Sequence, residues 1–304
     1  MKVIAVVVTY NRLSLLKECI NALGTQTHSL DQILIVNNGS TDGTTEWLHQ
    51  QNDLIAIQQP NLGGAWGFQV GIKEAYKLGA DWIWLMDDDT IPYPNALEAL
   101  VHAVYTIKEE DDEFGFFGSK AIWTDGSWHL MNKILEDTAF SGKRSVDYYK
   151  KKGITPSRFS TFVSMLLSKK AIKKVGLPIK EFFIWHDDIE YTHRITNSGM
   201  KGGLVEKSIV LHKTPTNYKN DIYNDSLNNL WKYRHGLRNQ LYERRYEKGY
   251  GSYLRNVFKR MIVLPVKILK KRKSDRWAYI KMVWLSSWEA LWFNPEKEYI
   301  GDHK

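Results

Sequence analysis

At 304 residues, the chain is long enough to bury a large core, either as one big domain or as one domain with an appendage. Its hydrophobic content of 43% and charged content of 25% are ordinary for a soluble globular protein. The single cysteine, Cys19, excludes an internal disulfide framework and fits a reducing compartment. It lies among apolar residues at helical spacing, which predicts a small core residue.

The net charge of +8 is unevenly distributed. Residues 232–281 carry sixteen Lys and Arg against three acidic residues, a net of +13, so the remaining residues sum to −5. This distribution predicts a separate basic surface, and it argues against a nucleic-acid affinity of the whole protein.

The first half of the chain alternates short apolar runs with amphipathic helical patterns. Strands are predicted at residues 3–8, 32–36, 54–57 and 82–86, and helices at 14–23, 41–49 and 68–78. Repeated β–α units predict an α/β, Rossmann-like fold: a mostly parallel, doubly wound central sheet with flanking helices. Ligands of such sheets bind at the carboxyl ends of the strands.

The second half is less regular. Strands are predicted at residues 114–122, 162–167 and 204–211. A short helix is predicted at 169–175, and a second helix follows the acidic segment 186–190 and ends at residue 197. Residues 140–158 are predicted to form a polar loop. From about residue 217 onward the sequence is helical, basic and aromatic.

Three consecutive carboxylates, Asp87, Asp88 and Asp89, follow an apolar strand that is expected to be buried on both faces. Asp87 and Asp89 point the same way if the strand extends through them. Like charges this close repel each other unless protons or a cation neutralise them, and Mg²⁺ or Mn²⁺ suits oxygen ligands. The triplet therefore predicts a metal and nucleotide-diphosphate site, with an ordinary acidic loop as the alternative.

Polar and glycine-rich turns follow the first three predicted strands. Thr9 and Asn38 lie at strand ends, where polar side chains can line a pocket, although residues 37–42 could also form a simple turn with Asp42 capping a helix. The glycines of residues 61–67 let backbone approach a diphosphate before a helix N-terminus, or they form an ordinary loop. They do not form a G-x-G-x-x-G fingerprint after the first strand, which argues against a nicotinamide dehydrogenase.

Four motifs in this order resemble family 2 glycosyltransferases of the GT-A fold over roughly residues 1–240: Thr9-Tyr10-Asn11-Arg12, Asn37-Asn38-Gly39-Ser40-Thr41-Asp42, Asn61-Leu62-Gly63-Gly64 and the aspartate triplet. Residues 185–188 (Trp-His-Asp-Asp) with Glu190 resemble the galactofuranosyltransferase branch, and the related rhamnosyltransferases are the nearest competitor. The resemblance implies a catalytic domain at 1–216, with a nucleotide-binding half at about 1–110 and an acceptor half at about 111–216. Residues 217–304 form a helical C-terminal region.

The resemblance also implies roles for individual residues. Asp87, Asp89 and His212 would hold Mn²⁺ or Mg²⁺. The nucleotide-sugar site would contain the following residues: Thr9, Tyr10, Asn11, Arg12, Asn38, Asn61, Gly64, Asp88, Trp185 and His186. Asn38 could bond a uracil edge, although the family more often has Asp there. Trp185 and His186 would shape the acceptor side, and core packing is the alternative for Trp185.

A second group of acids could supply the base. Asp187 and Glu190 fit a capping box, with Asp187 as the N-cap of a helix. Asp188 has no capping role in that pattern, so we assign it as the base that deprotonates the acceptor hydroxyl, with Asp187 as the fallback. A metal at the diphosphate makes a general acid unnecessary. The polar loop 140–158 could close over the donor as a lid or remain a disordered surface loop.

Five residues of the C-terminal region repeat along one face of a predicted helix: Trp277, Ile280, Trp284, Trp288 and Leu291. A basic helix with tryptophans on its apolar side is typical of a membrane interface, and the alternative is packing on the catalytic domain or on a second copy in a homo-oligomer. No stretch reaches the ~18 apolar residues of a spanning helix, and residues 1–8 do not resemble a signal peptide. The expected location is the cytoplasm or, peripherally, the inner face of the cell membrane.

The predicted activity is a metal-dependent, inverting transfer of a sugar to a lipid-linked or growing cell-surface polysaccharide. The best-matching donor is UDP-galactofuranose, and dTDP-rhamnose is the alternative. A sugar-1-phosphate nucleotidyltransferase is disfavoured because its glycine-rich loop after the first strand is missing. A non-catalytic scaffold of a polysaccharide assembly complex remains a further alternative.

Overall fold

The computed structural model describes residues 1–108 and 113–301. Their strands form one mixed sheet in the order β3-β2-β1-β4-β8-β6-β9-β5, with β7 paired to β9. The strands have the following bounds: β1 Val3–Thr9, β2 Gln32–Asn37, β3 Leu54–Gln58, β4 Trp82–Asp87, β5 Thr90–Pro92, β6 Phe114–Ile122, β7 Ile154–Pro156, β8 Met165–Ser168 and β9 Lys201–His212. Neighbours among β3, β2, β1 and β4 are parallel, as are β6 and β9. Strand β8 is antiparallel to β4 and β6, and β5 and β7 are antiparallel to β9. The predicted α/β fold with a central sheet is confirmed, but the sheet is parallel mainly in the half formed by β3, β2, β1 and β4.

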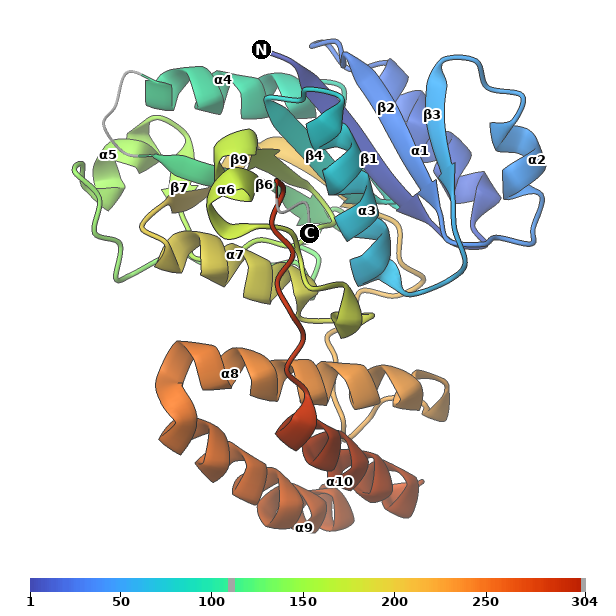
Figure 1. The fold of residues 1–304 in the computed structure, drawn as a ribbon, viewed down its shortest axis with the longest axis vertical. Helices are drawn as coiled ribbons and strands as arrows, with labels where there is room; N and C mark the ends of the chain where they lie inside the picture. Colours follow the sequence, from blue (N-terminus) through green and yellow to red (C-terminus); the bar gives the residue numbers. More distant parts are fainter. Residues whose placement is uncertain (109–112, 302–304) are drawn as a thin grey trace.

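Helices cover both faces of this sheet (Figure 1). They have the following bounds: α1 Leu13–Gly24, α2 Thr44–Leu48, α3 Gly64–Lys77, α4 Ala96–Lys108, α5 Val146–Lys151, α6 Lys169–Val175 and α7 Asp187–Asn197. Successive side chains of β1 point to opposite faces of the sheet and therefore contact different helices. Val3, Ala5 and Val7 pack with α1 and α4, whereas Ile4 and Val6 pack with α3, α6 and α7.

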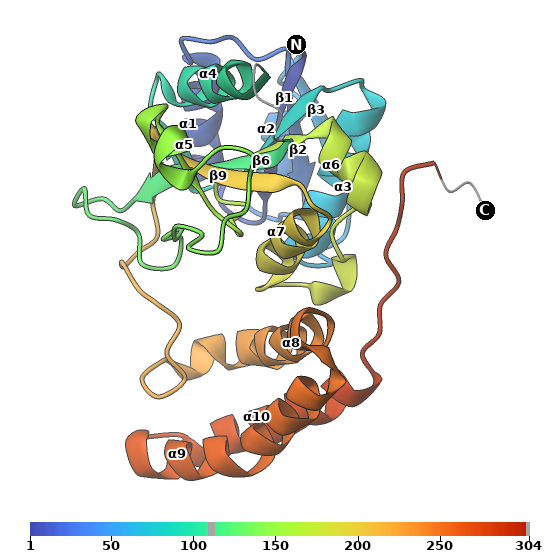
Figure 2. The same cartoon turned by 90° about the vertical axis from the view of Figure 1, so that its left-hand side faces the viewer.

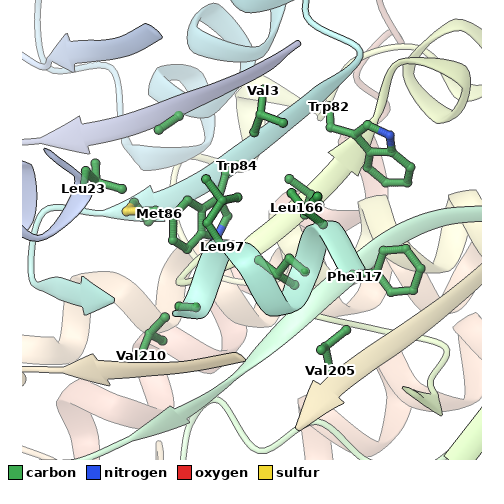
Figure 3. Close-up of a cluster of buried hydrophobic side chains, with 14 of the residues drawn as sticks. Val3, Leu23, Trp82, Trp84, Met86, Leu97, Phe117, Leu166, Val205 and Val210 are labelled. Atoms are coloured by element: carbon green, nitrogen blue, oxygen red, sulfur yellow. The ribbon is translucent and has the colours of Figure 1, made fainter. Parts of the chain in front are cut away.

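The core on the α1 and α4 side is dense and aromatic. Trp84 and Phe117 are fully buried there beside Leu97 of α4, and Figure 3 shows these side chains between the strands and that helix. Cys19 of α1 is fully buried in the same cluster, as its apolar neighbours predicted. Burial of each large apolar side chain contributes roughly 1.5–3 kcal/mol, so this core fixes the sheet on which the strand ends are presented.

Several predicted elements differ from the structure. Helix α4 and strand β5 were not predicted, and α3 begins at Gly64 instead of residue 68. Residues 140–158 are not one polar loop, because they contain α5 and β7. The ring of Tyr149 anchors α5 in the core, which two adjacent tyrosines followed by three lysines did not indicate.

The C-terminal helices form a separate layer below the sheet and its helices in both views (Figures 1 and 2). This layer consists of α8 (Leu230–Phe258), a π-helical segment (Lys259–Val263), α9 (Leu264–Lys271) and α10 (Arg276–Trp292). α8 lies nearest the sheet domain, and Tyr233 of α8 packs with Ile268 and Tyr279 in a core of its own. No helix among the described residues is long and apolar enough to span a bilayer.

After α10 the chain returns to the sheet domain (Figure 2). The N–H of Leu177 donates to the carbonyl of Glu298 at 2.8 Å, and Lys73 of α3 forms an ion pair with the Glu298 carboxylate. The boundary at 216/217 remains a prediction, and the division at about residue 110 falls outside the described residues.

Candidate active site

A cleft of about 680 Å³ lies between the carboxyl ends of β1 and β4, the start of α7 and helix α8. Fourteen of the fifteen residues that sequence analysis selected line it: Thr9, Tyr10, Arg12, Asn38, Asn61, Gly64, Asp87, Asp88, Asp89, Trp185, His186, Asp187, Asp188 and His212. No residue of 140–158 lines this cleft, so the structure does not place that segment as a lid over it.

Asn11 is the exception, and its side chain joins two loops instead of facing the cleft. Its Oδ1 accepts a hydrogen bond from the N–H of Thr41 at 2.7 Å, and its own N–H donates to Ser40 Oγ at 2.9 Å. Asn11 therefore holds the loops after β1 and β2 together. The predicted direct contact of Asn11 with a donor does not fit this placement.

The aspartate triplet occupies a turn at the end of β4. The strand ends at Asp87, and a short turn leads to β5, so Asp87 and Asp89 do not share a strand face as expected. The turn nonetheless brings both carboxylates together with His212, and one ligand atom of each lies within 4.8 Å of the others. Antiparallel pairing of Thr90 with His212 explains this proximity of residues far apart in sequence.

Arg12 partly neutralises the triplet. Its guanidinium lies 3.3 Å from Asp88 and forms a closer ion pair with Asp89. Asp88 also accepts hydrogen bonds from Thr9 Oγ1 at 2.8 Å and from the N–H of Tyr10 at 3.3 Å. Asp88 is therefore held by the motif that follows β1.

The three carboxylates differ in proton affinity. Burial, opposed by Arg12 and reinforced by the charge of Asp89, raises the pKa of Asp88 to about 6. Burial also acts to raise the pKa of Asp89, but His212 and Arg12 outweigh it and lower that pKa to about 2. Burial and the charges of Asp89 and Asp88 raise the pKa of Asp87 well above its usual value. This cluster has an excess of negative charge that a cation would relieve.

Two residues orient His212, and sequence analysis identified neither. Nδ1 of His212 lies 2.7 Å from Asn132 Oδ1, so Nδ1 carries the proton and Nε2 faces Asp89 Oδ1 at 3.2 Å. The ring of His129 stacks on that of His212 with centroids 4.4 Å apart. Burial and the charge of His212 lower the pKa of His129 to about 4, which keeps the stacked ring neutral.

The cluster fits a divalent cation. Its donor set is two carboxylates and an imidazole whose Nε2 faces Asp89, and a bound cation would take the place of the proton between Nε2 and that carboxylate. Asp89 Oδ1 is buried and lies 3.2 Å from Nε2 of His212, the position that a cation between the two groups would take. Carboxylates suit both Mg²⁺ and Mn²⁺, whereas an imidazole ligand favours Mn²⁺ over the harder Mg²⁺.

The second acid pair begins α7, and the predicted capping box is wrong. The N-cap is His186, in a left-handed conformation with φ 68°, and Asp187 is the first helical residue. Glu190 does not reach back to the helix start, because it forms a salt bridge of 2.9 Å with Arg194. Arg194 in turn donates to the carbonyl of Val175 at 2.7 Å, so Glu190 helps to attach α7 to α6.

Asp187 and Asp188 both line the cleft with raised proton affinity. Burial and the neighbouring charge of Asp188 raise the pKa of Asp187 to about 7. Burial and the charge of Glu243 raise the pKa of Asp188 to about 6, although Asp188 accepts a hydrogen bond of 2.7 Å from the N–H of Ile189. A carboxylate with such a pKa can accept a proton near neutral pH.

The glycine-rich turn also packs against the loop before α7, a role that was not predicted. A Cβ on Gly63, whose φ is 95°, would lie 2.5 Å from the carbonyl oxygen of Phe183. The close approach that requires glycine is therefore to the loop before α7. Gly64 starts α3, whose N-terminus opens on the cleft and could bind an anion. Asn38 accepts a hydrogen bond from Gln59 at 2.6 Å and lies almost fully buried beside this turn.

Helix α8 contributes a wall of the cleft that sequence analysis did not identify. Trp231, Lys232 and His235 line the cleft from α8. Trp185, which also lines it, packs edge-on against Tyr233 with ring centroids 5.2 Å apart. Trp185 thus has both the cleft position and the core packing that were considered as alternatives. The sequence signal that could have indicated this wall is the recurrence of Trp231, His235, Asn239 and Glu243 at every fourth position, which places them on one side of a helix.

Comparisons with known proteins find a matching family model and a similar galactofuranosyltransferase. A model described as glycosyl transferase family 2 matches residues 4–176. The galactofuranosyltransferase GlfT1 of Mycolicibacterium smegmatis is 27% identical over 229 residues, which cover 70% of this chain and 72% of that protein.

Two solved structures share the fold. The mannosyltransferase PcManGT from Pyrobaculum calidifontis, in complex with GDP-Man and Mn²⁺, has a TM-score of 0.52 and 14% identity over 95% of this chain and 74% of its own. GalNAc-T7 with UDP, GalNAc and Mn²⁺ has a TM-score of 0.59 and 16% identity over 93% of this chain, which spans only 53% of GalNAc-T7. These likenesses concern the fold. Because the family model covers more than half of the chain, the protein is a GT-A glycosyltransferase that belongs to glycosyl transferase family 2.

Proposed function

We propose that the protein is a metal-dependent, inverting glycosyltransferase. It transfers galactofuranose from UDP-galactofuranose to a lipid-linked or growing cell-surface polysaccharide. The observation that carries this proposal is a single cleft holding both a carboxylate–imidazole cluster and a second pair of buried acids. The name of the relative from Mycolicibacterium smegmatis supports the donor sugar.

The donor side of the cleft is built by β1, β4 and α3. Asp87, Asp89 and His212 would hold Mn²⁺ or Mg²⁺, which when bound neutralises the charge that develops on the diphosphate leaving group. Asp88, held by the motif after β1, faces the ribose or donor sugar in this arrangement. Asn38 would lie near the base of the nucleotide, and Asn61, Trp185 and His186, which line the same cleft, would complete the nucleotide-sugar site.

The acceptor side is built by the first turn of α7. Asp188 takes the proton of the acceptor hydroxyl while that oxygen attacks the anomeric carbon of the donor. The new glycosidic bond forms as the bond to the diphosphate breaks from the opposite face, so the configuration at that carbon inverts. The products are the extended glycan, the nucleoside diphosphate and one proton on Asp188. Asp187 is the fallback for this role.

Purified protein is expected to transfer sugar from UDP-galactofuranose in the presence of Mn²⁺, with little or no transfer from dTDP-rhamnose or UDP-hexopyranoses. Product formation on a lipid-linked saccharide is followed by mass spectrometry, and EDTA-treated protein is the control. Transfer from dTDP-rhamnose alone would replace the donor assignment while keeping the enzyme class. Release of pyrophosphate from a nucleoside triphosphate would instead indicate a nucleotidyltransferase.

We also propose that the C-terminal layer holds the enzyme at the cytosolic face of an anionic membrane. Trp277, Trp288 and Trp292 of α10 are 63%, 59% and 76% exposed. The expected apolar face is only partly free, because Ile280 is buried against α8 and α9. Exposed lysines of the π-helical segment, α9 and the residues that follow accompany these tryptophans: Lys259, Lys267, Lys270, Lys271 and Lys273. Such a combination favours an interface rich in anionic lipid.

Vesicle flotation tests this attachment. The protein is expected to float with phosphatidylglycerol-containing vesicles and to be released by high salt, because each basic residue near the surface contributes about 1 kcal/mol. Replacing Trp288 and Trp292 with Ala should weaken binding by roughly tenfold or more, since burial of each ring is lost. The Tyr105→Ala variant, which alters an exposed aromatic of α4, is the matched control. Equal flotation of all three proteins would refute the attachment.

A further inference from the structure

The loop that precedes the candidate base, residues 182–186, has a strained backbone. Phe183 and Trp185 have positive φ angles of 66° and 63°. The N–H of Ile184 donates to the carbonyl of Phe182 at 2.7 Å, so Phe183 is the centre of a γ-turn of the rare positive-φ kind. Residues with side chains adopt such conformations only where the surrounding structure imposes them.

One residue of α8 contacts three carbonyls of this loop. Nδ2 of the fully buried Asn239 lies 2.9 Å from the carbonyl oxygen of Phe182, 3.1 Å from that of Ile184 and 2.9 Å from that of Trp185. An amide NH₂ group has two hydrogens, so at least one is shared between carbonyls. Oδ1 of Asn239 accepts from the Arg238 guanidinium at 2.9 Å, which leaves Nδ2 directed at the loop.

Asn239 belongs to a stripe of α8 that faces the same loop. Four residues recur at every fourth position and therefore share one side of the helix: Trp231, His235, Asn239 and Glu243. The ring of His235 stacks on Phe183 with centroids 4.7 Å apart and an interplanar angle of 17°. Glu243 Oε2 lies 3.3 Å from His186 Nδ1, at the last residue before the acid pair. The stripe thus contacts the loop from its start to its end.

We propose that Asn239 is a positioning residue for the transfer reaction. Its hydrogen bonds hold the loop in the strained conformation from which α7 starts, and this fixes where Asp188 stands in the cleft. The inference rests on the proposed function, in which Asp188 is the base. Without these hydrogen bonds the γ-turn relaxes and the first turn of α7 shifts. The C-terminal helical region is then a part of the catalytic machinery and not only an attachment.

The Asn239→Asp variant tests the role directly, because it keeps the shape of the side chain and removes both N–H donors. We expect kcat to fall by about tenfold to 10²-fold, since small misplacements of a catalytic group have effects of that size. The affinity for UDP should change by less than about twofold, because the diphosphate side is built by β1, β4 and α3. Hydrogen–deuterium exchange of the substrate-free protein should become faster in residues 183–188 and remain unchanged in β1 and β4.

A second variant disturbs the loop through a different contact and guards against a failure of the first to fold. A Cβ on Gly236 would lie 2.6 Å from Cε3 of the Trp185 ring, so Gly236→Ala should push the loop away and lower kcat with UDP affinity retained. Gly251→Ala is the matched control, because it lies beyond the break of α8 at Gly249 and no atom lies within 4 Å of the added Cβ. Its kcat and loop exchange should match those of the wild-type protein.

Either of two results would overturn the proposal. One is unchanged exchange of residues 183–188 in a folded Asn239→Asp or Gly236→Ala variant. The other is faster exchange with kcat unchanged. A wild-type protein that transfers no sugar would instead refute the proposed function, because the exchange experiment requires no substrate.

Discussion

Replacing Asp188 with Asn is expected to lower kcat by about 10²- to 10⁴-fold while UDP and Mn²⁺ still bind, because the amide cannot accept the proton of the acceptor hydroxyl. The change preserves the shape of the side chain, and its oxygen can still accept the hydrogen bond that the N–H of Ile189 gives to Asp188 at 2.7 Å. Steady-state kinetics with a saccharide acceptor measure the loss, and calorimetry with UDP shows that the cleft is intact. The parallel Asp187→Asn variant decides between the two acids, since the true base gives the larger loss in kcat.

The pH profile of kcat/KM supplies the control for this variant. Burial raises the pKa of Asp188 to about 6, so the wild-type carboxylate is mostly protonated, and inactive as a base, below that pH. Activity should therefore rise with pH through about 6 and then level off. The residual activity of Asp188→Asn should lack this acidic limb. A limb that persists unchanged in both Asn variants would assign the ionisation, and the base, to another group.

Replacing Asp89 with Ala is expected to abolish metal-dependent turnover, with a loss of about 10³-fold or more. Asp89 contacts both Arg12 and His212, so its removal leaves His212 without this carboxylate partner and Arg12 with Asp88 alone. Calorimetry should show that Mn²⁺ no longer strengthens UDP binding. Thermal unfolding separates this loss from misfolding, because Mn²⁺ should stabilise the wild-type protein and not the variant.

Asp53→Ala is the matched control for the metal prediction. Asp53 is an exposed carboxylate directly before β3, at the opposite end of the sheet from the cleft, so its removal should change neither Mn²⁺ binding nor kcat. EDTA should reproduce the Asp89→Ala phenotype in the wild-type protein, and added Mn²⁺ should reverse it. Undiminished turnover of Asp89→Ala in EDTA would refute the metal assignment.

The sheet and most of the donor side could be predicted because their signals are local. Apolar runs such as Val3–Thr9 indicate buried parallel strands, and polar residues directly after them must then meet at one edge. Asp87 and Asp89 lie close to His212, as the family resemblance implied, but a turn brings them together and not a shared strand face. The order of these motifs along the chain was enough to locate the cleft at the carboxyl ends of the strands.

The support around the site could not be predicted, because it depends on pairings between distant segments. Asn132 lies 80 residues from His212, and nothing near it in sequence indicates that its amide orients that ring. The D-x-x-E pattern at Asp187 matched a capping box, but Glu190 instead binds Arg194, whose guanidinium also reaches the carbonyls of α6 and the residues after it. The ion pair between Glu190 and Arg194 is local, within α7, but the carbonyls that also hold the guanidinium come from another segment, and a local pattern does not indicate them.

The stacking of α8 on α9 and α10 has a consequence for the acceptor. If the outer side of α9 and α10 rests on a bilayer, two helical layers separate the cleft from the lipid, a standoff of about 20 Å for helices about 10 Å across. A sugar attached directly to a lipid phosphate would be too short to bridge that height. The length of the saccharide then decides which acceptors are used. Primers that already carry several sugars should be extended in preference to the bare lipid carrier.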